Sequence, residues 1–318
     1  MKDLELLVVI INYKTAKLVI DCLETLLPQL DSQRQAVVVD NASRDGSAEE
    51  ISEWILNHGK DFVGFIQSSD NSGFSGGNNQ GIKFRDAEFY LLANSDTLFR
   101  ENSVQELVDA ARNNPQAGMV SPRLEWPDGT PQISCFRFHT PISEFVNTAS
   151  TAIVTRLLSK WNVPIPVQPN PMWPQWTSFA CVLLKRTMIE DIGLMDEGYF
   201  LYYEDVDYSR TAFNKSWKIL HWPQARVVHL RGGSSDVKKN ISRKARLPAY
   251  VHASRARYFT KHYGYSGYIL ANLLWHMGAF INFSSRALGK KASSVCEHQW
   301  LDIWTPALHP LSPYRKTK

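Results

Sequence analysis

The chain has 318 residues and a mass of 36.2 kDa, with 44% hydrophobic and 21% charged residues. This length and composition suit one large α/β domain with an extension, or two small domains, and they exclude a disordered chain, a collagen and a long coiled coil. The four cysteines are scattered without a C-x-x-C pair, which excludes a disulfide scaffold and a zinc ribbon and fits a reducing compartment. The N-terminal sequence is too acidic, and its apolar run too short, for a signal peptide.

The formal net charge of +4 hides an uneven distribution along the chain. Residues 238–318 hold 14 Lys and Arg but only 2 Asp and Glu, a net charge of +12. The preceding 237 residues hold 21 basic and 29 acidic residues, a net charge of −8. A mildly acidic body therefore carries a strongly basic C-terminal quarter.

The first hundred residues alternate between apolar runs and helical patterns. Helices are predicted to begin near Thr15 and Ser47, and buried strands are predicted at residues 6–11, 36–39, 62–66 and 89–93. This alternation predicts right-handed crossovers and a mostly parallel sheet, in which ligands bind at the carboxyl ends of the strands. Asp40 and Asp96 both stand at such ends.

The rest of the chain is less regular. Residues 163–174 contain five prolines and are predicted to form a loop. We expect a helix over residues 204–214 and strands at 176–185, 218–220 and 226–230. From about residue 240 the pattern is helical and basic, and no apolar run reaches the roughly 20 residues of a membrane-spanning helix.

Two polar segments follow the second and third predicted strands. In VVVDNASRDGS, residues 37–47, Asp40 can accept the N3–H of uracil or thymine, or it can serve turn and capping chemistry. The glycine-rich NSGFSGGNNQGI, residues 71–82, opens a helix and can approach a phosphate closely, or it can be a tight turn with a helix cap. Its spacing matches neither the dinucleotide-binding motif nor the P-loop.

Acidic and aromatic residues mark three further segments. Asp96, in Asn94-Ser95-Asp96, can be a hard oxygen ligand for Mg²⁺ or Mn²⁺, or a helix cap. Residues 196–207 hold five carboxylates among four aromatic residues, where partial desolvation can raise a carboxylate pKa towards that of a general base; dipole partners of a helix are the alternative. His229 is either a metal ligand or structural, and Trp176 either stacks on a sugar or belongs to the core.

In this order the segments resemble the family-2 glycosyltransferases of the GT-A fold, over residues 6–262. The resemblance is carried by VVIINYKT at 8–15, the two polar segments above, LLANSDT at 91–97, WTSFACVLLKR at 176–186 and GLMDEGYFLYYEDVDYSRTAFNKSWKI at 193–219. The last segment, with VVHLRGGSS after it, most resembles the bacterial rhamnosyltransferase branch. Members of that branch use dTDP-L-rhamnose to extend lipid-linked saccharides of cell-wall or surface polysaccharides.

The resemblance implies a role for each matching residue. Asp205 is expected to be the catalytic base beside Glu204, and Asp96 and His229 are expected to hold Mg²⁺ or Mn²⁺ on the donor diphosphate. Trp176 and Asp207 are assigned to the acceptor or sugar. The residues assigned to the donor nucleotide are Asn12, Asp40, Asn71, Gly73, Asn78, Asn94 and Ser95.

Asn94 departs from the family pattern, because it stands where the D-x-D signature has its first aspartate. We therefore expect a modest metal affinity, with the metal arriving together with the nucleotide sugar.

The implied architecture is an α/β GT-A fold, a mostly parallel nucleotide-binding sheet flanked by helices. The catalytic domain is expected over residues 1–237, with a nucleotide-sugar-binding half (1–100) and an acceptor half (101–237), followed by a basic helical extension over 238–318. The implied reaction is an inverting transfer of a sugar, L-rhamnose from dTDP-rhamnose, to a saccharide or polyprenyl-linked saccharide. A UDP-sugar-dependent transferase of another hexose or of galactofuranose is the alternative.

The basic tail, residues 238–291, places cations on both sides of a largely apolar stretch at 268–283. This pattern is typical of a helix in a membrane interface, and the alternative is a helix packed on the catalytic domain or in a homodimer. We expect a cytoplasmic protein, with peripheral contact to the inner face of the plasma membrane as one of these two alternatives.

Three competing functions fit the sequence less well. A nucleic-acid-binding protein would use the basic tail but leave Asp40, Asp96 and Asp205 unexplained, so we expect no nucleic-acid partner. An inactive relative is disfavoured by the presence of the same three aspartates. A sugar-phosphate nucleotidyltransferase would need a glycine-rich loop after the first strand, where residues 12–15 read NYKT.

Overall fold

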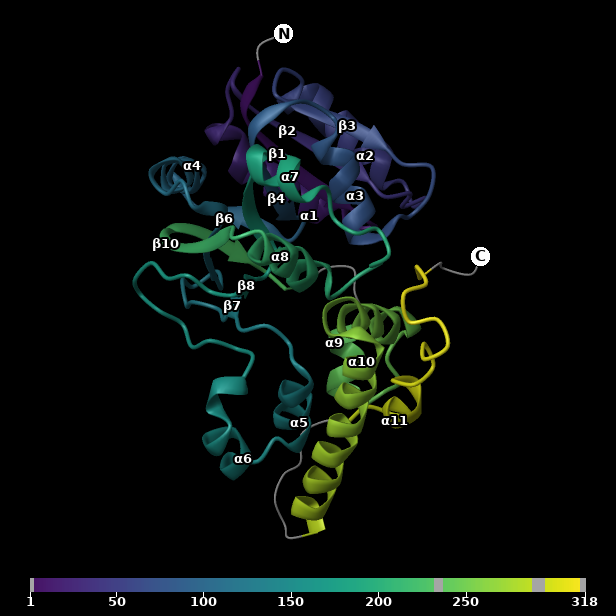
Figure 1. The fold of residues 1–318 in the computed structure, drawn as a ribbon. Helices are drawn as coiled ribbons and strands as arrows, with labels where there is room; N and C mark the ends of the chain where they lie inside the picture. Colours follow the sequence, from purple (N-terminus) through teal and green to yellow (C-terminus); the bar gives the residue numbers. More distant parts are fainter. Residues whose placement is uncertain (1–2, 232–236, 288–294, 315–318) are drawn as a thin grey trace. The chain divides into compact units, whose positions relative to one another are not determined.

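The computed structural model describes residues 3–231, 237–287 and 295–314, and the chain divides into two compact units (Figure 1). The sheet unit comprises residues 1–136, 165–197 and 205–234, and the helical unit comprises residues 137–164, 198–204 and 235–318. Residues 137–164 and 198–204 thus group with the basic C-terminal segment, although the sequence suggested one boundary at residue 237. A functional boundary at that point stays a prediction.

The sheet unit is built on an eight-stranded mixed sheet with the strand order β3-β2-β1-β4-β9-β6-β10-β5. The first four strands pair in parallel, whereas β9 runs antiparallel to β4 and β6, and β5 runs antiparallel to β10. A second, two-stranded sheet pairs β7 with β8. The strands are β1 (Leu4–Asn12), β2 (Arg34–Asp40), β3 (Val63–Gln67), β4 (Ala87–Asn94), β5 (Thr97–Phe99), β6 (Ala117–Glu125), β7 (Cys135–Phe136), β8 (Trp176–Thr177), β9 (Cys181–Lys185) and β10 (Lys218–His229).

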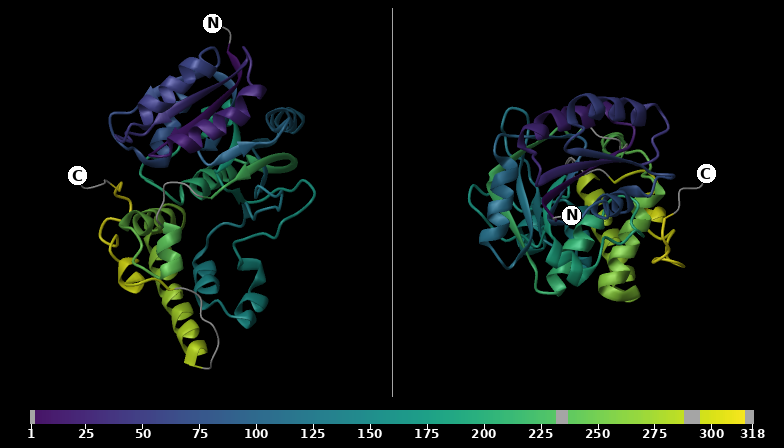
Figure 2. Two further views of the ribbon diagram at one scale, coloured as in Figure 1. Left: turned by 180° about the vertical axis from the view of Figure 1, so that it is seen from behind. Right: turned by 90° about the horizontal axis from the view of Figure 1, so that it is seen from above.

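Helices cover both faces of this sheet (Figure 2). Val8 and Ile10 of β1 pack into the core cluster with buried side chains of α1, α2 and α4, whereas Val9, on the other face, meets α3. The helical segments of the unit are α1 (Ala16–Leu26), η1 (Leu27–Gln29), α2 (Ser47–Trp54), η2 (Ile55–Gly59), α3 (Gly73–Ile82), α4 (Ser103–Asn113), α7 (Arg186–Ile192) and α8 (Glu204–Asn214). The first residue of α8, Glu204, groups with the helical unit. The predicted α/β architecture with a mostly parallel N-terminal half is confirmed.

Two strand predictions in the second half of the chain are wrong. The strand expected over residues 176–185 is broken, because β8 ends at Thr177 and β9 begins at Cys181. The two strands expected at 218–220 and 226–230 are the single strand β10. Its register with β6 shifts between Trp222 and Arg226, around Pro223, which has no N–H to offer the ladder.

The helical unit is organised around the long helix α10 (Ala249–Ala287), which changes direction at Gly264, where φ is 71°. The helix α5 (Pro141–Ala149), which packs against α10, begins at a capping box, in which the Thr140 and Ser143 side chains each bond the other residue's backbone N–H. The remaining helical segments are α6 (Ala152–Leu157), η3 (Ser159–Trp161), α9 (Val237–Arg243) and α11 (Gln299–Asp302). In the described part of the chain, no helix combines the length and apolarity needed to cross a bilayer.

Candidate active site

Three of the predicted site residues end neighbouring parallel strands of the sheet unit. Asn12, the last residue of β1, lies opposite Asp40, the last residue of β2. Asn94 ends β4 and lies opposite Ile11 of β1. These side chains therefore share the carboxyl edge of the sheet, where open α/β sheets bind ligands.

Asp40 is completely buried at this edge, and three hydrogen bonds hold its carboxylate. Oδ1 accepts from Asn12 Nδ2 at 2.7 Å and from the Ser43 hydroxyl at 2.5 Å, and Oδ2 accepts from the Ser43 backbone N–H at 3.2 Å. In this structure Asp40 thus fixes the turn from β2 towards α2. Its contact with the base of a nucleotide, implied by the resemblance, stays a prediction.

The glycine-rich segment differs from the expected loop, because most of it is the helix α3 itself. Gly73, with φ of 73°, begins the helix, and Gly81 lies against β1. A Cβ on Gly81 would stand 2.2 Å from Val9 Cγ1, so the glycine lets the helix approach the sheet closely. Close helix–strand packing therefore explains part of the glycine content that the sequence analysis assigned to phosphate approach.

Two asparagines that the sequence analysis did not single out tie this segment in place. Asn41 Nδ2 donates to Asn71 Oδ1 at 3.1 Å and to the Gly73 carbonyl at 2.9 Å. Asn79 donates to the Met195 carbonyl and to Glu197 Oε1, both at 2.9 Å. Both asparagines lie inside segments that the sequence analysis had identified. The structure adds that both side chains are buried.

Asp96 and His229 are brought together across 133 positions of the chain. Asp96 follows β4 and precedes β5, and β5 pairs with the end of β10 so that His229 lies opposite Thr97. The distance from His229 Nε2 to Asp96 Oδ1 is 3.4 Å, and the side chains are 12% and 7% exposed. His229 Nδ1 is buried and makes no hydrogen bond within the described residues.

This pair fits a divalent cation. Two ligands on adjacent positions of an octahedron, each at about 2.1 Å from the metal, lie about 3.0 Å apart, close to the observed separation. Three or more His, Cys, Asp or Glu side chains do not converge in the part of the chain that the structure describes. The pair would therefore supply two protein ligands, a number that is typical for Mg²⁺ with phosphate and water in the remaining positions.

Arg231 is a functional candidate that the sequence analysis missed. It has a positive φ of 56°, contacts Gln132, and its pKa is lowered by burial while the charge of Asp96 acts to raise it. A guanidinium that interacts with the carboxylate of Asp96, the predicted metal ligand, is suited to bind a diphosphate. The sequence offered one indication of Arg231, namely its position directly after His229 and Leu230.

Asp205 lies in the first turn of α8 and is half-buried. Burial raises its pKa to about 7, although hydrogen bonds from the backbone of Val206, of Asp205 itself and of Phe179 act in the opposite direction. The Val206 N–H reaches Asp205 Oδ1 at 2.8 Å. A half-buried carboxyl group that titrates near neutrality can both receive and release a proton at physiological pH.

The remaining predicted site residues are mostly enclosed by protein. Glu204 and Asp207 are 6% and 2% exposed, and Trp176 is 8% exposed and stacks on Phe136 at 4.2 Å between ring centroids. Ser95 Oγ accepts a hydrogen bond from the Thr15 hydroxyl at 3.0 Å. Core packing accounts for the position of Trp176, and its contact with a sugar stays a prediction.

Comparison with known proteins identifies the family. The family model described as glycosyl transferase family 2 matches residues 7–168, half of the chain, and this range contains the strand ends and the Asp96 turn described above. The chain belongs to the family-2 glycosyltransferases.

Two relatives with known names are similar to this glycosyltransferase in sequence. The low-salt glycan biosynthesis hexosyltransferase of Haloferax volcanii is 26% identical over 231 residues, which are 71% of this chain and 67% of the relative. The N-acetylglucosaminyl-diphospho-decaprenol L-rhamnosyltransferase of Mycobacterium tuberculosis is 27% identical over 151 residues, 46% of this chain and 48% of the relative. The match thus spans only about half the length of the mycobacterial relative.

The fold of the glycosyltransferase also has solved counterparts. A mannosyltransferase of Pyrobaculum calidifontis, in complex with GDP-Man and Mn²⁺, superposes with a TM-score of 0.56 at 14% identity, covering 92% of this chain and 77% of that protein. At this identity the likeness shows the fold, which is the expected GT-A type.

Proposed function

We propose that the protein is an inverting, metal-dependent glycosyltransferase that moves L-rhamnose from dTDP-rhamnose to a saccharide or polyprenyl-linked saccharide in the synthesis of a cell-wall or surface polysaccharide. The observation that carries the mechanism is the Asp205 carboxyl group, whose pKa burial raises to about 7. The donor and acceptor rest on the motifs shared with the rhamnosyltransferase branch and on the name of the mycobacterial relative.

In the proposed reaction Asp205 accepts the proton of an acceptor hydroxyl while that oxygen attacks the anomeric carbon of the donor. The new bond forms on the face opposite the nucleotide diphosphate as the bond between the anomeric carbon and the phosphate oxygen breaks. The configuration at the anomeric carbon is therefore inverted, as in inverting hydrolases where water is the nucleophile.

The strand ends would bind the donor. We assign the nucleotide to the edge formed by the residues Asn12, Asp40, Asn71, Gly73, Asn78, Asn94 and Ser95, and the diphosphate to Arg231. Asp96 and His229 would hold Mg²⁺ or Mn²⁺, and a cation there supplies charge neutralisation for the departing diphosphate. Glu204 would support Asp205, and Trp176 and Asp207 would face the acceptor or sugar.

A UDP-sugar donor with another hexose is the second candidate, because the Haloferax volcanii relative is named only as a hexosyltransferase. The deciding experiment is a screen of UDP- and dTDP-sugars by thermal shift and by nucleotide release, each with Mg²⁺, with Mn²⁺ and with EDTA. We expect stabilisation by dTDP-rhamnose that is lost in EDTA. Stabilisation by UDP-sugars alone would replace rhamnose with the second candidate.

Asp205→Asn tests the mechanism. The variant keeps the shape of the side chain but cannot accept the proton, so we expect normal donor-induced stabilisation and a loss of transfer of about 10²–10⁴-fold. Near-normal turnover by this variant would remove Asp205 from the role of base.

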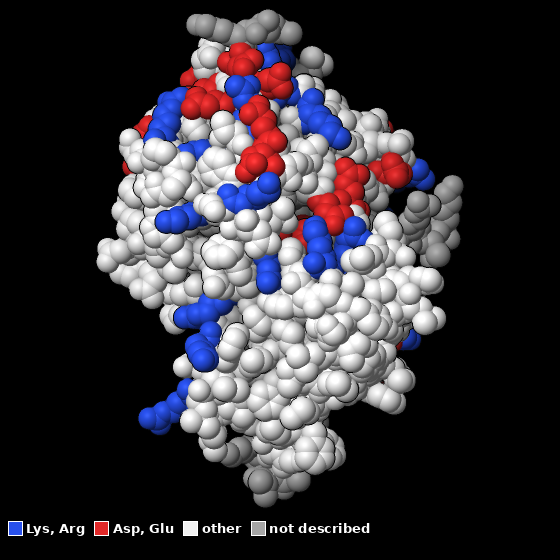
Figure 3. Space-filling view, in the orientation of Figure 1, with Lys and Arg blue, Asp and Glu red and all other residues white. Residues whose placement is uncertain are grey.

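The helical unit has a surface that suits a lipid-linked acceptor. Its helix α10 exposes an apolar stripe at helical spacing, with exposed fractions of 48–72%, formed by Leu270, Leu273, Met277, Phe280 and Phe283. Residues 262–285 of the same helix contain no Asp, Glu, Lys or Arg, and the face of the helical unit seen in Figure 3 is largely uncharged. We propose that this stripe contacts the cytoplasmic leaflet of the plasma membrane, with the exposed basic residues Lys239, Arg243, Lys244 and Lys261 facing anionic lipid.

A further inference from the structure

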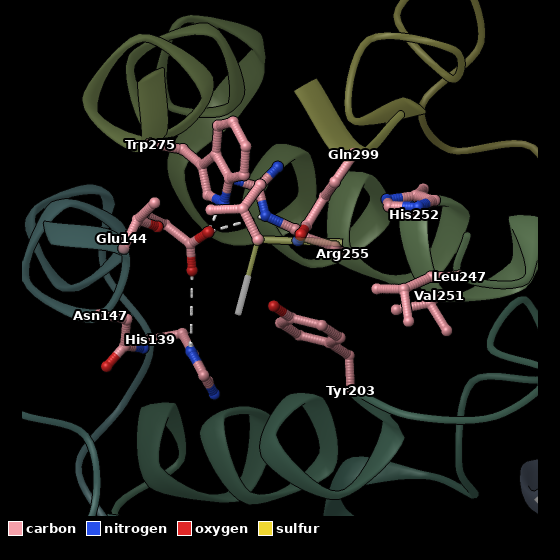
Figure 4. A pocket seen from close by; sticks show the side chains of 12 residues that line it. His139, Glu144, Asn147, Tyr203, Leu247, Val251, His252, Arg255, Trp275 and Gln299 are labelled. Carbon is pink, nitrogen blue, oxygen red and sulfur yellow. Dashed lines mark hydrogen bonds and ion pairs between the residues drawn. The ribbon is translucent and has the colours of Figure 1, made fainter. Parts of the chain in front are cut away.

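The helical unit contains a half-open cavity of about 240 Å³ that the proposed chemistry does not use (Figure 4). Its walls come from separate parts of the unit: α5 supplies Glu144 and Asn147, α10 supplies Arg255 and Trp275, and Tyr203 precedes α8. The cavity has room for about eight water molecules at ~30 Å³ each. That volume suits one sugar ring and is below the range of about 300–1,000 Å³ that is typical of drug-sized ligands.

A buried ion pair orients the polar groups of the cavity. Arg255 and Glu144 are each 8% exposed, and Arg255 Nε and Nη2 reach Glu144 Oε2 at 2.8 and 2.7 Å. Arg255 Nη1 also donates to Asn272 Oδ1 at 2.5 Å. Because desolvation offsets most of the attraction in a buried pair, stability alone is a weak reason for its presence. The pair cancels the charges of Arg255 and Glu144, and it holds the Glu144 carboxylate in one orientation.

Several hydrogen-bonding atoms at the cavity remain available to a ligand. Glu144 Oε1 has its nearest ionic partner, His139 Nδ1, at 3.9 Å, beyond hydrogen-bond distance. His252 is 5% exposed, and its Nε2 lies 3.9 Å from Asp302 Oδ2 and makes no hydrogen bond within the described residues. Gln299 uses its Oε1 to accept from the Cys296 N–H, which leaves its amide N–H groups for another partner. A buried imidazole and oriented carboxylate of this kind are costly without a ligand or water to satisfy them.

Aromatic rings form the apolar part of the wall. Trp275 is 5% exposed, and the Tyr203 ring is held by His139 and Tyr258, with ring centroids 5.2 and 5.5 Å away. In Figure 4 the Tyr203 hydroxyl points towards the centre of the cavity. Aromatic faces beside a few convergent polar groups match a sugar ring, which presents apolar C–H faces and a rim of hydroxyl groups.

We propose that this cavity binds one sugar ring of the saccharide acceptor, an inference that rests on the proposed function. The ligand class follows from the cancelled charge of the ion pair, the available hydrogen-bonding atoms, the aromatic wall and the size. The chain passes from the cavity to the proposed base within two residues, from Tyr203 to Asp205. The cavity would thus select the acceptor, while the edge of the sheet would select the donor.

The test uses the full-length protein and a panel of methyl pyranosides (glucoside, galactoside, N-acetylglucosaminide and rhamnoside) at up to about 10 mM. Binding of each pyranoside is measured by saturation-transfer NMR in the absence of the donor. Asn147→Trp places a large ring at an exposed position that lines the cavity. Ser159→Trp, at an exposed position outside it, is the matched control. We expect at least one pyranoside to bind the wild type and the control but not Asn147→Trp.

Tyr203→Phe gives a milder second variant, because it removes one hydroxyl and keeps the ring. We expect pyranoside binding, and the acceptor KM in transfer assays, to weaken by about 3–10-fold, with donor-induced thermal stabilisation unchanged. The proposal is wrong if no pyranoside binds the wild type, or if Asn147→Trp binds as well as Ser159→Trp. If pyranosides bind the cavity but no nucleotide sugar binds the protein, the proposed function fails and the cavity assignment stands.

Discussion

At the scale of single residues, the site depends on carboxylates in unlike surroundings. Asp40 is wholly enclosed by hydrogen bonds, Asp96 lies beside an imidazole, and Asp205 is half-buried with a raised pKa. The sequence placed Asp40 and Asp96 at the carboxyl ends of strands and Asp205 at the start of a helix, and the structure has them there. It could not distinguish their protonation, because pKa depends on which atoms surround each carboxyl group after folding.

The raised pKa of Asp205 predicts the pH dependence of transfer. A base must be deprotonated, so we expect kcat/KM to fall about tenfold per pH unit below an apparent pKa near 7, and to be level above it. The measurement is a pH profile at low donor and acceptor concentration. An acid limb near pH 4, the ordinary value for an aspartate, would contradict the assignment.

The same shift predicts an effect on stability. A carboxyl whose folded-state pKa is raised favours the folded state fully only below its unfolded pKa, about 4, and this contribution is lost as the pH rises through about 7. Asp205→Asn, which resembles the protonated acid, should therefore unfold at a higher temperature than the wild type at pH 8. At pH 4 the two proteins should unfold at similar temperatures; an equal difference at both pH values would argue against a buried charge.

At the scale of elements, periodicity predicted the helices and parallel strands, and close packing explained residues that periodicity could not. The helix predicted at 204–214 is α8, and the four N-terminal strands lie where apolar runs were found. The glycines of 73–81 looked like a phosphate loop in the sequence, yet Gly81 serves the contact between α3 and β1. Such contacts join residues distant in the chain, so no local pattern reveals them.

Gly278 of α10 allows a similar approach to α5, and it provides a prediction. A Cβ at this position would lie 2.7 Å from the Phe145 carbonyl oxygen and 2.9 Å from the Ala149 nitrogen, both backbone atoms that cannot rotate away. We expect Gly278→Ala to destabilise the protein by about 1–3 kcal/mol and to lower its Tm by several degrees.

The sign of this effect is informative, because alanine normally stabilises a helix relative to glycine by about 1 kcal/mol. The neighbouring Met277→Ala, at a position that is 57% exposed, serves as the control and should change the Tm little. An unchanged or raised Tm in Gly278→Ala would show that the two helices are not packed at this point.

At the scale of the whole molecule, charged residues and exposed apolar residues are distributed unevenly along the chain. The acidic body contains the proposed donor site, and the basic quarter leads into a helix with an exposed apolar stripe. Net charge alone suggested nucleic acid, a membrane or a dimer. The exposed fractions of 72% for Phe280 and 70% for Phe283 favour a partner that is itself apolar.

Membrane contact predicts lipid-dependent sedimentation. We expect the protein to co-sediment with vesicles that contain anionic lipid, and much less with neutral vesicles, because cations near the surface contribute about 1 kcal/mol each. Phe280→Ser combined with Phe283→Ser should reduce binding by at least tenfold and leave donor-induced stabilisation unchanged. Lipid-independent behaviour together with a dimer that the double variant dissociates would instead assign the stripe to a second copy of the chain.

The sequence by itself determined most of the helices and strands, the family and most of the candidate residues, because strand periodicity and strand-end motifs are local properties of the chain. Only the tertiary structure decided which of them meet. It brought His229 to Asp96 through the pairing of β10 with β5, enclosed Asp40, raised the pKa of Asp205, and built the sugar-sized cavity from α5, α10 and α11. Distances, burial and electrostatic shifts arise between segments that are far apart in sequence, and the folded chain alone fixes them.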